Sequence, residues 1–417
     1  MAAVLAVAGV FALPGPRPRA LAAIAALVLA PVLLIGELWD NSQIASLRGH
    51  PAALVLALAL AIGIVAALAA LFVRRPVALP LLAFAALPFR IPVVTGGSSA
   101  NLLVPLSGIV AGGVAAYAWT RLRQSPEAAA RNGRAWAREE EHPRRVELAI
   151  VVFLLLYALQ AGYSSDFEQA VKNVAFFYVP FALLLKLLTQ VAWTRRLALA
   201  CLGVTTGLAL TFAAIGFWEY QARELLWNQK VIESNQFETY FRVNSLFFDP
   251  NIYGRYLALV MVALAGVLLW ERRPRDIGLT ALMLAVLWGG LVLTFSQSSF
   301  AALLLGLVVL ACLRWPARPI LIALGALAVL GVIAVLAAPG VFGIKGGSSR
   351  ALDKATSGRF DLLKGGVGMF LDRPLQGYGS GSFAKRYRAR ESASSVRAAS
   401  ASHTIPVTIA AEQGVLG

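Results

Sequence analysis

A strongly basic stretch near the end of the sequence is its most chemically suggestive feature. Residues 339–402 contain eleven lysines and arginines and four acidic residues, and His403 follows directly. Guanidinium groups stay charged and match phosphate oxygens in a two-pronged geometry, so this excess indicates an anionic ligand or an anionic surface. A histidine beside the cluster can move a proton near neutral pH. A solvated basic loop near lipid headgroups explains the charge equally well.

The composition shows where these residues must be held. The chain has 417 residues, of which 59% are hydrophobic and 14% are charged, against about 25% charged in a typical soluble domain. Apolar runs recur along the chain, many close to the ~20 residues that span a bilayer. Such runs, rich in alanine and leucine, indicate helices and not the alternating strands of a barrel. The sequence therefore predicts an all-α polytopic membrane protein with about 12–13 transmembrane helices.

The net charge of +16 would indicate nucleic acid in a soluble protein. Here the cations lie mostly between apolar runs, so topology explains them and no nucleic-acid partner is expected. Placing the short basic junctions in the cytoplasm gives six external segments: 37–50, 90–100, 163–170, 219–250, 296–298 and 339–402. The two cysteines lie in predicted spans and the three histidines form no metal-binding pattern, so neither a metal nor a cofactor is expected.

Four regions follow from this topology. Residues 1–145 hold N-terminal transmembrane helices and a cytoplasmic linker, and residues 146–338 hold a transmembrane core with the external loop 219–250. Residues 339–402 form the large basic external loop, and residues 403–417 begin a truncated C-terminal helix. Two spans are weakly marked. Ala2–Leu13 is short but is kept as a span, and the proline-containing segment 76–93 is either a kinked span or a broken helix lining a cavity.

The basic loop has internal order. Apolar residues recur at helical spacing over Arg359–Asp372, which predicts an amphipathic helix lying in the membrane interface. Pro374 should end it, and glycines at 377, 379 and 381 should then form a flexible turn. No phosphate-binding loop of the Walker type is present in this stretch.

Three short motifs resemble those of the O-antigen ligase and polymerase superfamily. The stretch Arg242-Val-Asn-Ser-Leu-Phe-Phe-Asp-Pro-Asn251 resembles its arginine-to-Pro-Asn motif. Gly358-Arg359, followed by Asp372-Arg-Pro-Leu-Gln-Gly-Tyr-Gly-Ser-Gly-Ser-Phe383, resembles its second signature. Ser402-His403-Thr404, followed by Glu412-Gln-Gly414, resembles its third. Their order and spacing also match, over roughly residues 145–417.

The chain departs from the family pattern at three places. Ser296-Gln-Ser-Ser299-Phe300 stands where the family commonly has an arginine after a serine pair. Thr404 replaces a usual asparagine after the histidine, and Asp249 replaces one before the proline. These changes bear on the substrate more than on the fold.

The resemblance implies a metal-independent glycosyltransferase of bacterial envelope polysaccharide or lipopolysaccharide biosynthesis. It implies an undecaprenyl-diphosphate-linked glycan donor, a lipid or glycan acceptor, and a multi-pass position in the cytoplasmic (inner) membrane. Arg242 and Arg359 would hold the diphosphate, and His403 would orient or deprotonate the acceptor hydroxyl.

Three further cations could contact the anionic donor. Lys172, Arg255 and Arg90 lie at or near the outer ends of predicted spans, and an ionisable residue there is a functional candidate. Snorkelling toward lipid headgroups is the alternative explanation for each of them.

Other functions remain open from the sequence. A ligase and a polymerase share these motifs, and protein glycosylation is a third acceptor class. A transporter or flippase for an anionic lipid or solute would need inverted repeats and charges near the membrane centre. The predicted spans carry almost no central charge, which favours chemistry at the outer face. A non-catalytic membrane scaffold would not need the ordered motifs.

Overall fold

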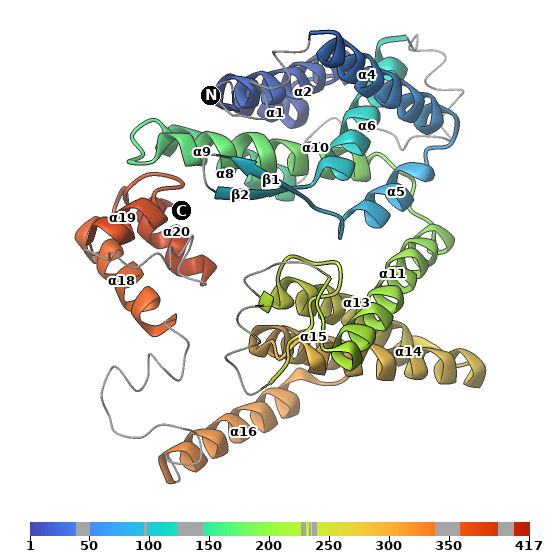
Figure 1. Ribbon diagram of the computed structural model, residues 1–417, viewed down its shortest axis with the longest axis vertical. Coiled ribbons are helices and arrows are strands. Elements are labelled where there is room, and N and C mark those ends of the chain that lie inside the picture. The colour runs from blue at the N-terminus through green and yellow to red at the C-terminus, as the bar shows by residue number, and fades with distance from the viewer. Residues whose placement is uncertain are drawn as a thin grey trace.

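The computed structural model describes residues 1–38, 51–95, 98–123, 145–226, 231–232, 235, 240–337, 359–390 and 404–417. Within these residues the chain is helical apart from one two-stranded hairpin (Figure 1). Among these described residues, six segments are long and apolar enough to cross a membrane: Leu54–Arg74, Phe167–Thr189, Arg195–Ala222, Pro250–Trp270, Pro274–Leu293 and Gln297–Arg314. The all-α polytopic class is confirmed, while the number of spans stays a prediction.

The N-terminal helices share one hydrophobic core, whose buried residues run from Ala3 to Cys201. The helices are α1 (Ala2–Ala12), α2 (Pro16–Leu38), α4 (Pro51–Arg74), α5 (Ala78–Ala86), α6 (Val104–Arg123), α8 (Arg145–Ala161), α9 (Phe167–Asn173) and α10 (Val179–Thr189), with a π-helical turn η1 (Val174–Tyr178) between the last two. The expected first span is too short: the 11 residues of α1 extend about 16 Å, roughly half of a ~30 Å hydrocarbon core. Its Val7 and Phe11 are fully buried, so α1 serves as packing for its neighbours.

The segment 76–93 is neither a kinked span nor a broken helix. α5 covers only Ala78–Ala86. The chain then enters an antiparallel hairpin of β1 (Ile91–Thr95) and β2 (Ser98–Leu102), with Ile91 opposite Leu102. Pro88 and Pro92 stand at this change, and proline both ends helices and is tolerated in edge strands, which explains the switch.

The middle of the chain forms a second group of helices (Figure 1). It contains α11 (Arg195–Ala222), α13 (Pro250–Trp270), α14 (Pro274–Leu293), α15 (Gln297–Arg314) and α16 (Ala317–Ala337). Asp249 caps α13 by accepting the N–H of Asn251 at 2.6 Å, and Pro250 fits the first helical position. Asp249, which departs from the family pattern, therefore serves as the N-cap of α13. The edge-to-face contact of Phe89 with Phe212, with ring centres 6.0 Å apart, joins this group to the first.

The C-terminal group contains α18 (Arg359–Asp372), α19 (Phe383–Arg390), α20 (Ile405–Gln413) and a 3-10 turn η2 (Gly414–Leu416). The predicted helix Arg359–Asp372 is confirmed residue for residue. Met369 is buried on its inner side. Leu363, Val367 and Leu371 recur every four residues and are 36%, 42% and 68% exposed. This exposed apolar stripe suits the membrane interface that the sequence predicts for the helix.

Segments predicted to be external meet each other in the fold. The hydroxyl of Tyr163 donates to the carbonyl of Gln376 at 2.6 Å, which joins external segments 163–170 and 339–402. The N–H of Val243 donates to the carbonyl of Leu293 at 3.2 Å, which joins segment 219–250 to the end of α14, close to the predicted external segment 296–298. These contacts are consistent with the topology that the charges predict.

Candidate functional site

A single buried carboxylate anchors the loop that begins at Arg242. Glu219 lies in the last turn of α11 and has no exposed surface. One carboxylate oxygen accepts the backbone N–H groups of Asn244 at 3.1 Å and Ser245 at 2.7 Å, and the other accepts that of Leu226 at 3.3 Å. Burying a carboxylate is costly unless its oxygens are hydrogen-bonded. The loop and the acid therefore stabilise each other, and they hold Ser245 in a left-handed conformation with φ 50°.

The guanidinium of Arg242 is oriented by two oxygens and is half-buried. Its Nε donates to the carbonyl of Thr294 at 3.0 Å, and its Nη2 donates to Oδ1 of Asn251 at 3.3 Å. The backbone N–H of Arg242 donates to Oδ1 of Asn235 at 3.1 Å, and Nδ2 of Asn235 donates to the backbone carbonyl of Arg242 at 2.9 Å. Within the part of the chain that the structure describes, Arg242 has no acidic partner, so its remaining N–H groups can bind an anion.

A turn of hydroxyl residues faces this arginine across the helix ends. α14 ends at Leu293 with Thr294 as its C-cap, Phe295 adopts φ 50°, and the hydroxyl oxygens of Ser296 and Ser299 lie 2.7 Å apart at the start of α15. A Cβ added at Gly254 of α13 would lie 2.6 Å from the Ser299 hydroxyl oxygen. Only glycine therefore allows α13 and α15 to meet here, and the close contact brings the N-terminal ends of the two helices to the same place.

Two more of the predicted cations lie close to each other. Arg255 lies one helical turn after Asn251 on α13, so both project from the same face of the helix. Partial burial and then repulsion from the Arg255 charge lower the pKa of Arg90, which follows α5. Both residues keep a large exposed surface, so the burial of Arg90 is only partial. The start of α13 thus carries Asn251, which accepts from Arg242, and Arg255, whose charge acts on Arg90.

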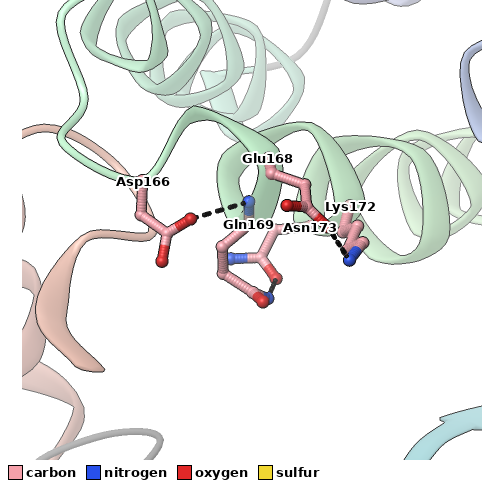
Figure 2. A network of polar contacts seen from close by, with 5 residues as sticks. All are labelled: Asp166, Glu168, Gln169, Lys172 and Asn173. Atoms are coloured by element: carbon pink, nitrogen blue, oxygen red, sulfur yellow. Dashed lines mark hydrogen bonds and ion pairs between the residues drawn. The ribbon is translucent and has the colours of Figure 1, made fainter. Parts of the chain in front are cut away.

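Lys172 has an acidic partner in this structure. Its ammonium group forms an ion pair with Glu168, one turn earlier on α9 (Figure 2). Asp166 caps the same helix by accepting the N–H of Gln169 at 3.3 Å, and Gln169 donates to Asn173 at 2.9 Å. The π-helical turn begins directly after Asn173, and such turns are frequent at functional sites. An anion at Lys172 would have to compete with Glu168.

A second buried carboxylate organises the glycine turn. Glu412 of α20 accepts the N–H of Gly381 at 2.8 Å with one oxygen and that of Phe383 at 3.0 Å with the other. A Cβ at Gly379 would lie 2.3 Å from the Cα of Ser164, and one at Gly377 would lie 2.3 Å from the carbonyl oxygen of Glu412. The expectation of a flexible turn is therefore wrong: the glycines are needed because the turn is tightly packed between α20 and the start of α9.

The other two proposed catalytic residues are defined less fully. Arg359 is the first residue of α18, and only the backbone of Arg359 is described. His403 lies outside the described residues, directly before Thr404, the N-cap of α20. The convergence of Arg242, Arg359 and His403 therefore stays a prediction. Among the described residues no group of three or more histidine, cysteine, aspartate or glutamate side chains could hold a metal ion.

The fold defines a class of protein: an all-α polytopic membrane protein, in which Arg242 is held at the start of α13 by Thr294 and Asn251. Residues 281–417 match the family model described as O-Antigen ligase. The match confirms the resemblance to the O-antigen ligase and polymerase superfamily over the last third of the chain, including Arg359, the glycine turn and His403. It supports a glycosyltransferase-like enzyme acting on lipid-linked glycans. No curated protein and no solved structure matches the chain.

The two carboxylates were the residues that sequence reasoning missed. Glu412 was recognised only as part of a motif, and Glu219 was not singled out. The available signal was an acidic residue inside or at the end of an otherwise apolar helix, since such a residue needs an internal partner. Neither acid reaches an arginine; each binds backbone N–H groups of a loop instead.

Proposed function

We propose that this protein transfers a glycan from an undecaprenyl-diphosphate-linked donor to an acceptor hydroxyl at the outer face of the bacterial cytoplasmic membrane. The observation that supports the proposal is the half-buried guanidinium of Arg242, which Thr294 and Asn251 hold at the start of α13 and which has no acidic partner among the described residues. A guanidinium held in place binds phosphate oxygens in a two-pronged geometry, and a diphosphate is an anion of suitable charge and geometry.

In this reaction the acceptor oxygen attacks the first carbon of the donor sugar. The bond from that carbon to the diphosphate oxygen breaks, and undecaprenyl diphosphate leaves with the electron pair. Arg242 and Arg359 stabilise the negative charge that grows on the leaving group. His403 takes the proton of the acceptor hydroxyl or holds that hydroxyl in line. Lys172, Arg255 and Arg90 are secondary contacts to the anionic donor. Since the arginines supply the positive charge, the transfer needs no metal.

The acceptor decides between two versions of this proposal. A ligase passes the glycan to an outer acceptor such as the core of a lipopolysaccharide, whereas a polymerase passes it to another lipid-linked repeat unit. Growth of a ladder of products on the carrier lipid would identify a polymerase. A single product on a new acceptor would identify a ligase.

The test is glycan transfer in reconstituted membranes from an undecaprenyl-diphosphate-linked donor. Arg242→Ala, Arg359→Ala and His403→Ala should each abolish transfer while the protein remains folded and inserted. Arg242→Lys should restore only a small part, because lysine keeps the charge but loses the two-pronged geometry. Arg272→Ala is the matched control, since Arg272 is an exposed cation just beyond the opposite end of α13. Wild-type transfer by any of the three alanine variants would remove that residue from the site.

A further inference from the structure

Two exposed aromatic rings stack on each other beside the loop that begins at Arg242. The ring centres of Tyr240 and Phe295 lie 4.9 Å apart, with an angle of 32° between the ring planes, so each ring covers one face of the other. Even so, Tyr240 is 40% exposed and Phe295 is 43% exposed. The exposed area must therefore come from the outer faces and the edges of the pair, which a ligand can reach.

The contacts on either side place this ring pair next to the guanidinium of Arg242. Nε of Arg242 donates to the carbonyl of Thr294 at 3.0 Å, and the next contact along the same two segments is that of Tyr240 with Phe295. Phe241, which lies between Tyr240 and Arg242 in the sequence, contacts an aromatic ring of α11 instead, with ring centres 6.4 Å apart. Tyr240 and Arg242 therefore face the same turn, between α14 and α15, and an anion bound by the guanidinium would lie beside the rings.

Phe295 has a backbone conformation that phenylalanine rarely adopts. Its φ is 50°, in the left-handed region where a bulky residue is strained and glycine or asparagine is not. Its ring is not buried in a core either, so neither backbone preference nor burial explains why a phenylalanine stands here. Strained residues are concentrated at binding sites, where the surrounding structure holds them. The ring itself is therefore a candidate for ligand binding.

A sugar is the group that fits an exposed aromatic face beside a phosphate site. The face of an aromatic ring is electron-rich, whereas the C–H groups on the face of a pyranose carry a small positive charge, so the two stack. In a glycan linked through a diphosphate, the first sugar is bonded directly to a phosphate oxygen. A diphosphate held by Arg242 would thus bring that sugar to Tyr240 and Phe295.

We infer that Tyr240 and Phe295 form a platform on which the first sugar of the donor stacks. The inference rests on the proposed function, since the diphosphate at Arg242 fixes where the glycan begins. The platform positions the sugar and contributes to specificity, because stacking requires a sugar face that carries C–H groups and no axial hydroxyl.

Binding of undecaprenyl diphosphate with and without one attached glucose separates the sugar from the rest of the donor. Glucose is the probe because its ring hydroxyls are all equatorial, so both of its faces carry C–H groups. Phe295→Asn removes one ring but keeps a residue that tolerates the left-handed conformation, and Tyr240→Leu keeps an apolar side chain without a ring. Each should raise the Kd of the glucose-bearing lipid about tenfold, the effect of one aromatic contact, and leave the Kd of the bare lipid unchanged.

Two further variants complete the set, with every Kd measured by microscale thermophoresis in detergent. Trp218→Leu is the matched control: Trp218 is a 50% exposed aromatic residue near the outer end of α11, and its replacement should change neither Kd. Arg242→Ala should instead weaken binding of both lipids, because both carry the diphosphate.

Equal losses of affinity for the two lipids in the ring variants would overturn the platform, since they would show that the rings hold Arg242 or lie in the lipid interface. Unchanged binding of the glucose-bearing lipid would overturn it as well. Glycan transfer in reconstituted membranes tests the proposed function separately. If the wild-type protein shows the sugar-dependent difference in Kd but transfers no glycan, the proposed function fails and the platform stands. If it transfers glycan and both ring variants bind the two lipids normally, the platform fails and the proposed function stands.

Discussion

The carboxylate of Glu219 offers the sharpest test of how the loop that begins at Arg242, the arginine loop, is held in place. In Glu219→Ala, three backbone N–H groups lose their acceptor in a buried place. An unsatisfied buried donor costs about 1–3 kcal/mol, and water can reach part of the space left by the side chain. We therefore expect the free energy of unfolding to fall by about 3–5 kcal/mol.

Glu219→Gln should cost much less, because the two oxygens have different partners. The amide oxygen can take the position that accepts Asn244 and Ser245 at 3.1 and 2.7 Å, leaving the amide nitrogen toward Leu226. Only the longest of the three bonds, at 3.3 Å, is then lost. The expected loss of stability is about 1–2 kcal/mol, and Arg242 should keep its place.

Thermal unfolding in detergent and glycan transfer in membranes should both follow this order. Glu219→Gln should keep most of the activity, and Glu219→Ala should lose nearly all of it as Arg242 moves away from Thr294. Glu224→Ala is the control, since Glu224 is an exposed acid that follows α11. Equal effects of the alanine and glutamine variants would refute the assignment of the bonds, and a fully stable alanine variant would refute the anchoring role.

Three other perturbations test separate parts of the structure. Gly379→Ala should lower the free energy of unfolding by about 2–3 kcal/mol, because φ is 91° and the new Cβ would lie 2.3 Å from the Cα of Ser164. Gly203→Ala, in open space on α11, should instead raise the free energy of unfolding by about 0.5–1 kcal/mol. Thermal unfolding measures both changes. Arg90→Gln should raise the melting temperature but weaken donor binding: burial and the Arg255 charge lower the pKa of Arg90, so its charge destabilises the fold throughout the pH range below that pKa. EDTA should leave the transfer rate unchanged, and loss of activity restored by a divalent cation would refute the metal-independent mechanism.

The sequence predicted helices well where a long apolar run had clear ends. α13, which covers Pro250–Trp270, coincides with one of the apolar runs of spanning length, and Asp249 and Pro250 fix its start. Prediction failed for the segment 76–93. Its apolar composition suits a span, but α5 stops at Ala86 and a hairpin follows. Hydropathy alone cannot detect that change, because an isolated hairpin depends on packing against neighbouring helices and not on local sequence.

The sequence pointed to the cations of the candidate site but not to the residues that hold its loops in place. Arg242 stood out through the family motif, and Arg255 and Arg90 as charges at the ends of apolar runs; in the structure Arg242 donates to Asn251, and the Arg255 charge acts on Arg90. The glycine turn was recognised, but its rigidity was not, because that depends on contacts with Ser164 and Glu412, far away in the sequence. Likewise, nothing local to Glu219 shows that its partners are backbone groups at residues 226, 244 and 245.

The two buried carboxylates also explain how a basic site can stay available for an anion. An acid placed beside Arg242 would form an ion pair and neutralise the charge that a diphosphate needs, as Glu168 does for Lys172. Glu219 and Glu412 instead accept backbone N–H groups of the loops that pack against them. Each acid thus gives its loop a fixed shape without consuming a cation. The arginine loop is ordered in advance while Arg242 keeps N–H groups for the substrate, which is the condition under which fixed charges stabilise a leaving diphosphate.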